Sequence, residues 1–255
     1  MKAEIRYLAL VSKTPHRLAQ FYRQALGLRE LGRSPEGDVS LTDGFYNLTF
    51  LLQRPDRPEA GFRLAGVAVD DLSELEGRLA REGAELRPDE GGIHGGEFRL
   101  HDPNGVPVAV STTNFGVPAG EAALPRLVHA AMCVPDGARI AQFYAQVFGF
   151  EKASPDHWGP SGRFLRDGTT NLAILASAEE IQAIGRRVNL DRMTSGWSHF
   201  GFEALSAEDV VALLPEDAGA TQRTDRPKSQ GYYRIWDPDG NHFDLRSLPA
   251  WQDGD

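Results

Sequence analysis

The chain lacks most of the features that would place it in a disulfide framework, a membrane or a nucleic-acid complex. It carries one cysteine in 255 residues, Cys133, so no intrachain disulfide can form, and this fits a reducing cytoplasm. No stretch approaches the roughly 18 apolar residues of a membrane span, and Met1–Arg6 has no apolar run typical of a secretory signal. The formal net charge is −9 and basic residues do not cluster, which argues against a nucleic-acid groove. We therefore expect a cytoplasmic protein whose 41% hydrophobic content is sufficient for packed cores.

What the chain does contain is one hairpin sequence in two copies. Residues 233–245 read YRIWDPDGNHFDL, and residues 98–110 read FRLHDPNGVPVAV. The Asp-Pro-x-Gly core is turn chemistry, because Pro fixes φ, Asp bonds its own backbone and Gly accepts a positive φ. Each copy therefore predicts a β-hairpin. In the second strand the first copy has Ala109 where the second has Asp244, and a carboxylate inside a strand either faces water or is held by something in the interior.

The repeat extends over the rest of the chain and predicts the fold class. Residues 140–150, IAQFYAQVFGF, restate residues 18–28, LAQFYRQALGL, and both end at a glycine that terminates a helix. Strands are expected before and after each helix, so each half is two βαβββ units. The predicted fold is α+β, with four such units in two domains, each a curved mixed sheet that forms an open cup. We assign residues 1–112 and 126–249 to the domains and 113–125 to a linker, and expect a longer, partly helical insertion at 177–196.

Aligned in this way, the halves differ at three strand positions, where the second half has ordinary metal-ligating side chains and the first half does not. The pairs are Tyr7 and His129, Leu64 and His199, Ala109 and Asp244. Alone, each histidine could be a hydrogen-bonded core residue and the carboxylate an exposed one. Together, two His and one carboxylate match the facial triad of non-haem Fe(II) sites, which leaves coordination positions free. We predict a metal site in the second half, and expect the first-half residues to fill their cup with apolar and aromatic bulk.

With these residues the chain resembles the vicinal oxygen chelate superfamily, which includes glyoxalase I, methylmalonyl-CoA epimerase, fosfomycin and bleomycin resistance proteins, and extradiol dioxygenases. The resemblance rests on the Phe-Tyr-x-x-x-x-Gly helix endings, the two Asp-Pro-x-Gly hairpins, and His129, His199 and Asp244. It implies a sheet that cups a divalent metal, with Fe(II) first and Mn, Zn, Ni or Co as alternatives. An N-terminal domain without metal ligands followed by a C-terminal domain with a metal site is an arrangement similar to that of the two-domain extradiol dioxygenases.

The sequence departs from this family pattern in three ways. The family usually has Glu at the last ligand, and Asp244 is one methylene shorter. Glyoxalase-like and epimerase-like members use a fourth ligand at a position matched here by Ala173, which cannot ligate. That favours a three-ligand site with room for substrate and O₂. Extradiol enzymes carry a further histidine beside the metal ligands, somewhat before the mid-domain ligand. No histidine stands around Ile184, so the acid/base role is unassigned.

Four residues are candidates for catalytic roles around the metal. His157 lies in a loop that could reach over the mouth of the cup, or could be a surface residue. His242 shares strand parity with the carboxylate ligand, and either faces the cavity or sits on its rim. Tyr233 could hydrogen-bond a phenolate and Arg234, which stands where the family has Tyr, could pair with an anion; Tyr232 is one residue further away. These last residues could equally pack only within the hairpin.

The resemblance implies a metal-dependent extradiol-type dioxygenase that cleaves a catechol-like vicinal diol with O₂. One alternative is a glyoxalase-like or epimerase-like lyase or isomerase that keeps the metal. Another is a non-catalytic drug-binding or metabolite-binding resistance protein. The expected partners are a small-molecule substrate and O₂, without nucleic acid or membrane, and homo-oligomerisation is compatible with each alternative.

Overall fold

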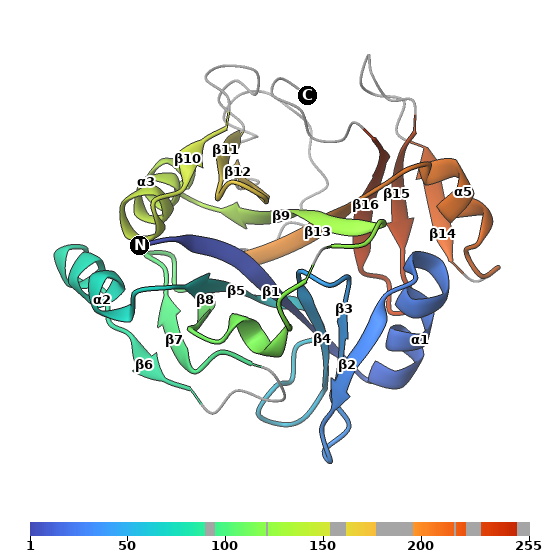
Figure 1. Cartoon of the computed structure of the whole chain (residues 1–255), viewed down its shortest axis with the longest axis horizontal. Coiled ribbons are helices and arrows are strands. Elements are labelled where there is room, and N and C mark those ends of the chain that lie inside the picture. Colours follow the sequence, from blue (N-terminus) through green and yellow to red (C-terminus); the bar gives the residue numbers. More distant parts are fainter. Residues whose placement is uncertain are drawn as a thin grey trace.

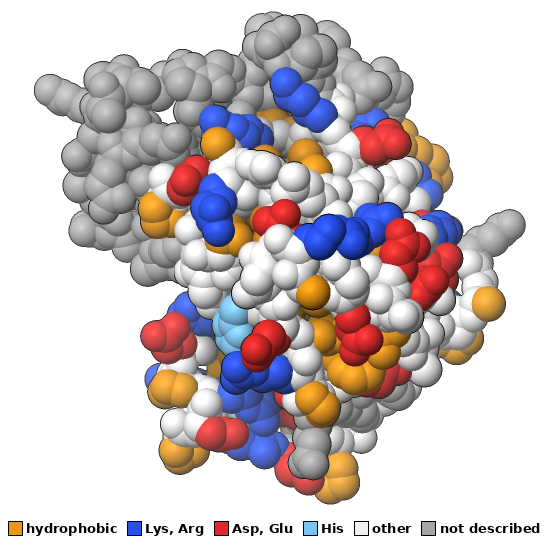
Figure 2. Space-filling view, turned by 90° about the vertical axis from the view of Figure 1, so that its left-hand side faces the viewer, with side chains coloured by type: hydrophobic (Ala, Val, Ile, Leu, Met, Phe, Trp, Pro, Cys, Tyr) orange, Lys and Arg blue, Asp and Glu red, His pale blue; other side chains and the backbone are white. Residues whose placement is uncertain are grey.

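The chain folds into two eight-stranded mixed sheets (Figure 1). The structure is a computed structural model, and it describes residues 1–89, 95–120, 122–153, 162–176, 196–216, 218–222 and 231–248. Most of the predicted insertion, residues 177–195, lies outside these ranges. Over the described part of the chain, no helix is long and apolar enough to cross a membrane. On the face drawn in Figure 2, cationic side chains adjoin anionic ones instead of forming one basic surface.

The first sheet has the strand order β2-β3-β4-β1-β5-β8-β7-β6. Its strands are β1 (Ala3–Ser12), β2 (Arg29–Arg33), β3 (Val39–Thr42), β4 (Asn47–Leu52), β5 (Gly61–Val69), β6 (Arg87–Pro88), β7 (Phe98–His101) and β8 (Pro107–Ser111). Two helices interrupt them, α1 (Pro15–Leu26) and α2 (Leu72–Arg81), and the 3₁₀ helix η1 (Asn114–Gly116) follows.

The second sheet repeats this order as β10-β11-β12-β9-β13-β16-β15-β14. Its strands are β9 (Arg126–Val134), β10 (Glu151–Lys152), β11 (Gly162–Arg166), β12 (Asn171–Ala176), β13 (Gly196–Ala204), β14 (Gly219–Gln222), β15 (Tyr232–Trp236) and β16 (His242–Ser247). Its described helices are α3 (Gly137–Phe148) and α5 (Ala207–Ala212).

Strand directions confirm the predicted βαβββ units. In the first sheet β1 runs parallel to β4 and antiparallel to β5, and β5 runs parallel to β8. The same relations hold among β9, β12, β13 and β16. Each sheet is therefore two units joined along their first strands, and it stays open at its outer strands. The sequence analysis missed β2, because its residues are exposed or half-buried and show no apolar alternation.

Helix α1 follows its sequence signals and joins the two halves. Pro15 occupies its first turn, and Gly27 ends it with φ of 65°, a left-handed conformation that glycine adopts without steric cost. Its buried Tyr22 stacks on Phe50 of its own sheet and donates a 3.0 Å hydrogen bond to Asp237 of the other half. Figure 1 shows α1 beside α5 accordingly.

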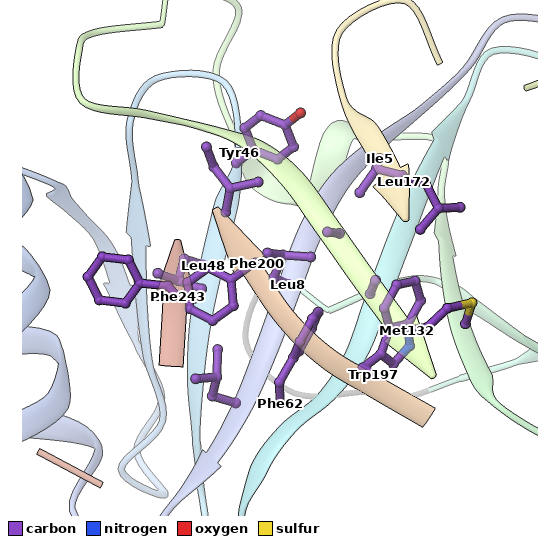
Figure 3. Close-up of a cluster of buried hydrophobic side chains, with 14 of the residues drawn as sticks. Ile5, Leu8, Tyr46, Leu48, Phe62, Met132, Leu172, Trp197, Phe200 and Phe243 are labelled. Atoms are coloured by element: carbon purple, nitrogen blue, oxygen red, sulfur yellow. The ribbon is translucent and has the colours of Figure 1, made fainter. Parts of the chain in front are cut away.

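The apolar faces of the two sheets form one core. Figure 3 shows side chains of the first half, such as Phe62, beside Trp197 and Phe200 of the second. The ring centroid of Phe62 lies 5.4 Å from that of Trp197 and 5.6 Å from that of Phe200. Because the buried helix-side face of each sheet is covered by the other half, the opposite, cup-side faces are left for ligands.

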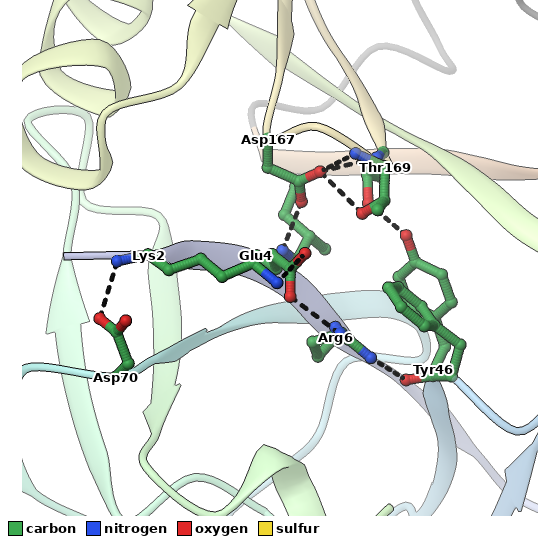
Figure 4. A network of polar contacts seen from close by, with 10 residues as sticks. Lys2, Glu4, Arg6, Tyr46, Asp70, Asp167 and Thr169 are labelled. Carbon is green, nitrogen blue, oxygen red and sulfur yellow. Dashed lines mark hydrogen bonds and ion pairs between the residues drawn. The ribbon is translucent and has the colours of Figure 1, made fainter. Parts of the chain in front are cut away.

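Two equivalent turns exchange hydrogen bonds between the halves. The Ile5 N–H of β1 donates to Asp167 Oδ2 at 2.6 Å (Figure 4), and the Leu127 N–H of β9 donates to Asp43 Oδ2 at 2.9 Å. Asp43 and Asp167 are counterparts in the repeat, and so are the two donors. Each half thus binds the first strand of the other, and burial raises the pKa of Asp43 against the backbone hydrogen bonds that lower it.

Candidate metal centre in the C-terminal sheet

Cross-strand registers bring the three predicted ligands onto adjacent central strands. His129 on β9 and Asp244 on β16 both pair with Gly201 of β13. His199 lies two residues before that glycine, and side chains two apart on a strand share a face. The three side chains therefore project from one side of the sheet.

The first sheet holds their counterparts in the same arrangement. Tyr7 on β1 and Ala109 on β8 both pair with Gly66 of β5, and Leu64 precedes that glycine by two residues. The alignment made from the sequence is thus confirmed by strand pairing. All three side chains are buried, and none of them is an ordinary metal ligand.

The ligand candidates approach one another closely. The rings of His129 and His199 have centroids 5.4 Å apart, and His199 Nε2 lies 3.6 Å from Asp244 Oδ2. Two atoms that bind one ion at about 2.0–2.2 Å each can be at most about 4.4 Å apart. The 3.6 Å separation is compatible with a shared ion. The three residues are 2%, 8% and 2% exposed, so such an ion would lie at the base of the sheet's cup.

Neighbouring side chains orient both imidazoles. His129 pairs with Asn171 of β12, and its Nδ1 lies 2.9 Å from the Asn171 Oδ1, an acceptor that suits a proton on Nδ1. In that tautomer Nε2 is the nitrogen that can bind a metal ion. His199 Nδ1 lies 3.2 Å from Ser198 Oγ, which leaves its Nε2 toward Asp244. Burial lowers the pKa of His199 well below its usual range, against the attraction of Asp244. A neutral imidazole is the form that binds metals.

The carboxylate of Asp244 already has strong partners. Arg234, its cross-strand neighbour, donates from Nε to Oδ1 at 2.9 Å and from Nη2 to Oδ2 at 3.3 Å. Tyr232 donates its hydroxyl to Oδ2 at 2.6 Å. Burial raises the pKa of Asp244, but His199, Arg234 and Tyr232 together hold it well below its ordinary value. The group is therefore ionised and paired.

These contacts decide how well the site fits a metal ion. A carboxylate offers about four acceptor positions, and three of those on Asp244 are taken by Arg234 and Tyr232. In agreement, no group of three or more His, Cys, Asp or Glu side chains within the described ranges is arranged to hold an ion as it stands. The donor set of two imidazoles and one carboxylate fits a divalent cation, which must compete with Arg234 for the carboxylate.

Of the other residues predicted to have catalytic roles, two lie beside the three ligand candidates. His242 lies on the face of Asp244 and stacks on His199, with centroids 5.1 Å apart and planes 27° apart. Arg234 also lies in the site, although it binds the ligand carboxylate instead of awaiting a substrate anion. His157 lies outside the described residues.

The choice of Tyr233 was wrong. Strand alternation sends it to the opposite face of β15, where Glu208 of α5 is its hydrogen-bond neighbour and burial raises its pKa. Tyr232 lies two residues before Arg234, faces the same side of β15, and is the tyrosine that contacts the site. Its parity could have been read from the pairing of Arg234 with Asp244. Asn171 was also missed, and the sequence marks it only as the repeat of Asn47.

The N-terminal cup contains a cavity of about 1100 Å³, whose base includes Tyr7 and Leu64. Those residues and Ala109 pack in a buried apolar cluster with Phe115. The expectation that apolar bulk fills this cup was therefore wrong. The walls carry long charged side chains such as Arg33, which donates from Nε to Glu30 at 2.6 Å.

Comparison with known protein families agrees with this architecture. Residues 126–245 match the Glyoxalase/Bleomycin resistance protein/Dioxygenase superfamily, and residues 8–111 match the Glyoxalase-like domain. Together the two matches cover most of the chain. The protein belongs to the glyoxalase/bleomycin resistance/dioxygenase superfamily, the vicinal oxygen chelate proteins, and its layout is that of the two-domain extradiol dioxygenases. No curated protein matches the sequence.

Solved structures share the fold at low sequence identity. The 2,3-dioxygenase LapB from Pseudomonas sp. KL28 is 19% identical, with a TM-score of 0.69 over 98% of this chain and 95% of its own. The Mn(II)-bound glyoxalase from Novosphingobium aromaticivorans is 18% identical, with a TM-score of 0.69 over 98% and 83%. Homoprotocatechuate 2,3-dioxygenase from Arthrobacter globiformis is 17% identical, with a TM-score of 0.66 over 99% and 82%.

Proposed function

We propose that the C-terminal sheet binds a divalent metal ion on His129, His199 and Asp244, and presents it to two neighbouring oxygens of a small substrate. The observation that supports this is the convergence of three potential ligands from three different strands. At the equivalent positions the N-terminal sheet has side chains that are not ordinary metal ligands. A purely structural role for the histidines would not require a hairpin carboxylate to lie 3.6 Å from His199 Nε2.

The reaction we propose is extradiol-type cleavage of a catechol-like ring with O₂. A bound Fe(II) ion would supply a template for both oxygens of the diol and for O₂. The position of the family's fourth ligand is occupied by the buried, apolar Ala173, which leaves room for such a substrate. LapB and the Arthrobacter enzyme, both named as 2,3-dioxygenases, have the same fold.

Side chains around the three ligands have roles that follow from their contacts. Asn171 holds the His129 ring so that Nε2 faces the site. Tyr232 donates to Asp244 and helps His199 and Arg234 to keep it ionised. His242 is half-buried on the same face, and imidazole is the side chain whose charge changes near neutral pH. We assign to His242 the transfer of the substrate's phenolic proton.

The test is metal analysis of anaerobically purified protein, followed by O₂ uptake with iron-loaded protein and a panel of catechols. We expect one metal ion per chain, and O₂ consumption matched by a yellow ring-cleavage product. His199→Ala should lose both metal and O₂ uptake. His101→Ala removes an exposed histidine of the first sheet and should keep both. Metal-dependent conversion of a hemithioacetal or an epimerisable thioester without O₂ uptake would refute the dioxygenase proposal.

The ion pair between Arg234 and Asp244 favours one rival, a binding or resistance protein without a metal. In that case Arg234 neutralises the buried carboxylate permanently, and the cup only sequesters a ligand. Wild-type protein that binds no divalent ion at millimolar concentration, and whose ligand affinity is unchanged by a chelator, would establish the rival.

A further inference from the structure

The N-terminal cup has the properties of a second ligand site, separate from the candidate metal centre. Its cavity of about 1100 Å³ is large enough for a drug-sized molecule. It lies on the cup side of the first sheet, whereas His199 and Asp244 belong to the second.

The floor of the cavity is apolar and rigid. Tyr7, Leu51 and Leu64 line it and are buried. The Tyr7 ring stacks on Phe115 with centroids 4.9 Å apart and planes 11° apart, which fixes its position. Burial raises the pKa of Tyr7 to about 12, so the phenol stays neutral at physiological pH. This surface suits the flat or aliphatic body of a small molecule.

One wall carries Arg99, the repeat counterpart of Arg234. Arg234 faces Asp244 across the hairpin, but Arg99 faces Ala109, which has no acceptor. Arg99 therefore extends to Asp89, to which both Nε, at 2.6 Å, and Nη2 donate. The loss of a carboxylate at position 109 redirects a guanidinium from the strand to the cavity wall.

A second guanidinium, that of Arg57, retains donors for a ligand. Among the described residues its ionic partner is Asp38, with Nη1 and Oδ1 3.7 Å apart, which is too far for a hydrogen bond. The same Asp38 oxygen accepts the Leu52 N–H at 2.7 Å. The side chain of Arg57 is 25% exposed, and both Arg57 and Arg99 lie near enough to lower the pKa of the Tyr7 phenol against burial. A guanidinium with free N–H groups matches a carboxylate, which it can bind through two hydrogen bonds.

The overall charge of the lining restricts the ligand further. The described lining residues include arginines and carboxylates in equal number. A polyanion such as a nucleotide therefore gains no net attraction from the lining as a whole. A single carboxylate attached to an apolar body satisfies both the floor and the wall.

We propose that the N-terminal cup binds small hydrophobic monocarboxylates, with the body against Tyr7 and Leu64 and the carboxylate on Arg57 and Arg99. This site requires no metal and does not depend on the function proposed for the C-terminal sheet. The half of the chain that lacks metal ligands would then sense or hold an acidic aromatic or aliphatic metabolite.

The test is calorimetric titration of the full-length, chelator-treated chain with phenylacetate, phenylacetamide and phenethylamine. We expect saturable binding of phenylacetate, and binding of the amide and amine that is weaker by about tenfold or more, as for one lost charge-assisted hydrogen bond. Arg57→Gln should reduce phenylacetate affinity by about the same factor. Arg99→Gln serves as a second variant if Arg57→Gln is unfolded by circular dichroism.

His199→Ala is the control that separates this proposal from the metal centre, and it should leave phenylacetate binding unchanged. Binding that disappears in His199→Ala and persists in Arg57→Gln would place the ligand in the C-terminal cup and overturn the proposal. Absence of phenylacetate binding, or equal affinity for acid and amide, would also overturn it.

Discussion

Replacing Arg234 by Gln should strengthen metal binding at the candidate centre. In the structure the guanidinium donates to both oxygens of Asp244, at 2.9 and 3.3 Å, and it does so from the directly opposite strand position. A divalent ion must displace at least part of this contact before it can share the carboxylate with His199. Glutamine keeps a polar side chain, although a shorter one, and removes the positive charge.

The magnitude follows from the contact that is lost. A hydrogen bond to a charged group contributes about 1.5–3 kcal/mol, which corresponds to roughly tenfold to 150-fold in an equilibrium constant. Repulsion between the guanidinium and the incoming ion acts in the same direction, because like charges about 4 Å apart near a protein surface interact by several kcal/mol. We therefore expect an affinity gain of at least about tenfold for Mn²⁺ or Zn²⁺.

The assay is competition with a fluorescent chelator at fixed pH, using metal-free protein. The matched control is Arg99→Gln, which alters the equivalent arginine in the sheet without ligands and should leave metal affinity unchanged. An Arg234→Gln affinity equal to or lower than wild type would refute the argument. It would show that Arg234 positions Asp244 for the ion instead of competing with it.

Three further predictions test other parts of the structure. Asn171→Leu removes the acceptor for the first-strand histidine and should lower metal affinity about 10-fold to 100-fold, as outer-shell partners do, measured by the same competition. Burial raises the pKa of Asp237 from 3.8 to about 6. The folded chain therefore holds more protons than the unfolded one in that interval, and this contribution to stability is lost as pH rises through about 6; Asp237→Asn should flatten the slope in urea titrations between about pH 4 and 7. Gly66→Ala would place a Cβ 2.5 Å from the Phe115 ring and should destabilise the fold by about 1–3 kcal/mol. By contrast, Gly77→Ala in α2 meets only an atom 4.0 Å away and should stabilise it by about 0.5–1 kcal/mol in thermal unfolding.

The metal-ligand candidates could be predicted because the chain contains its own comparison. Tyr7, Leu64 and Ala109 occupy strand positions equivalent to those of His129, His199 and Asp244, so the chemical differences stand out without any second sequence. The fold could be predicted for the same reason, since each βαβββ unit is marked by a helix that ends at glycine and by an Asp-Pro-x-Gly turn.

The errors arise where position depends on tertiary contacts. Tyr232 and Tyr233 are adjacent and chemically alike, and only the pairing of Arg234 with Asp244 decides which one faces the site. The ion pair between Arg234 and Asp244 is recognised only from the distance between the two side chains, and a sequence does not supply that distance. The N-terminal cavity depends on where charged side chains extend, as Arg57 illustrates, and hydrophobic patterning carries no information on this.

The exchanged hydrogen bonds between the halves have a consequence for cooperativity. Asp43 and Asp167 each bind the backbone of the opposite half's first strand, and those strands carry Tyr7 and His129. Separation of the halves would remove these two hydrogen bonds and leave two backbone N–H donors without their partners, each at a cost of about 1–3 kcal/mol where it stays buried. The chain should therefore melt in a single calorimetric transition. A substitution that destabilises the N-terminal half would then destabilise the folded C-terminal half, with its candidate metal centre, by the same free energy, although it contacts no residue there.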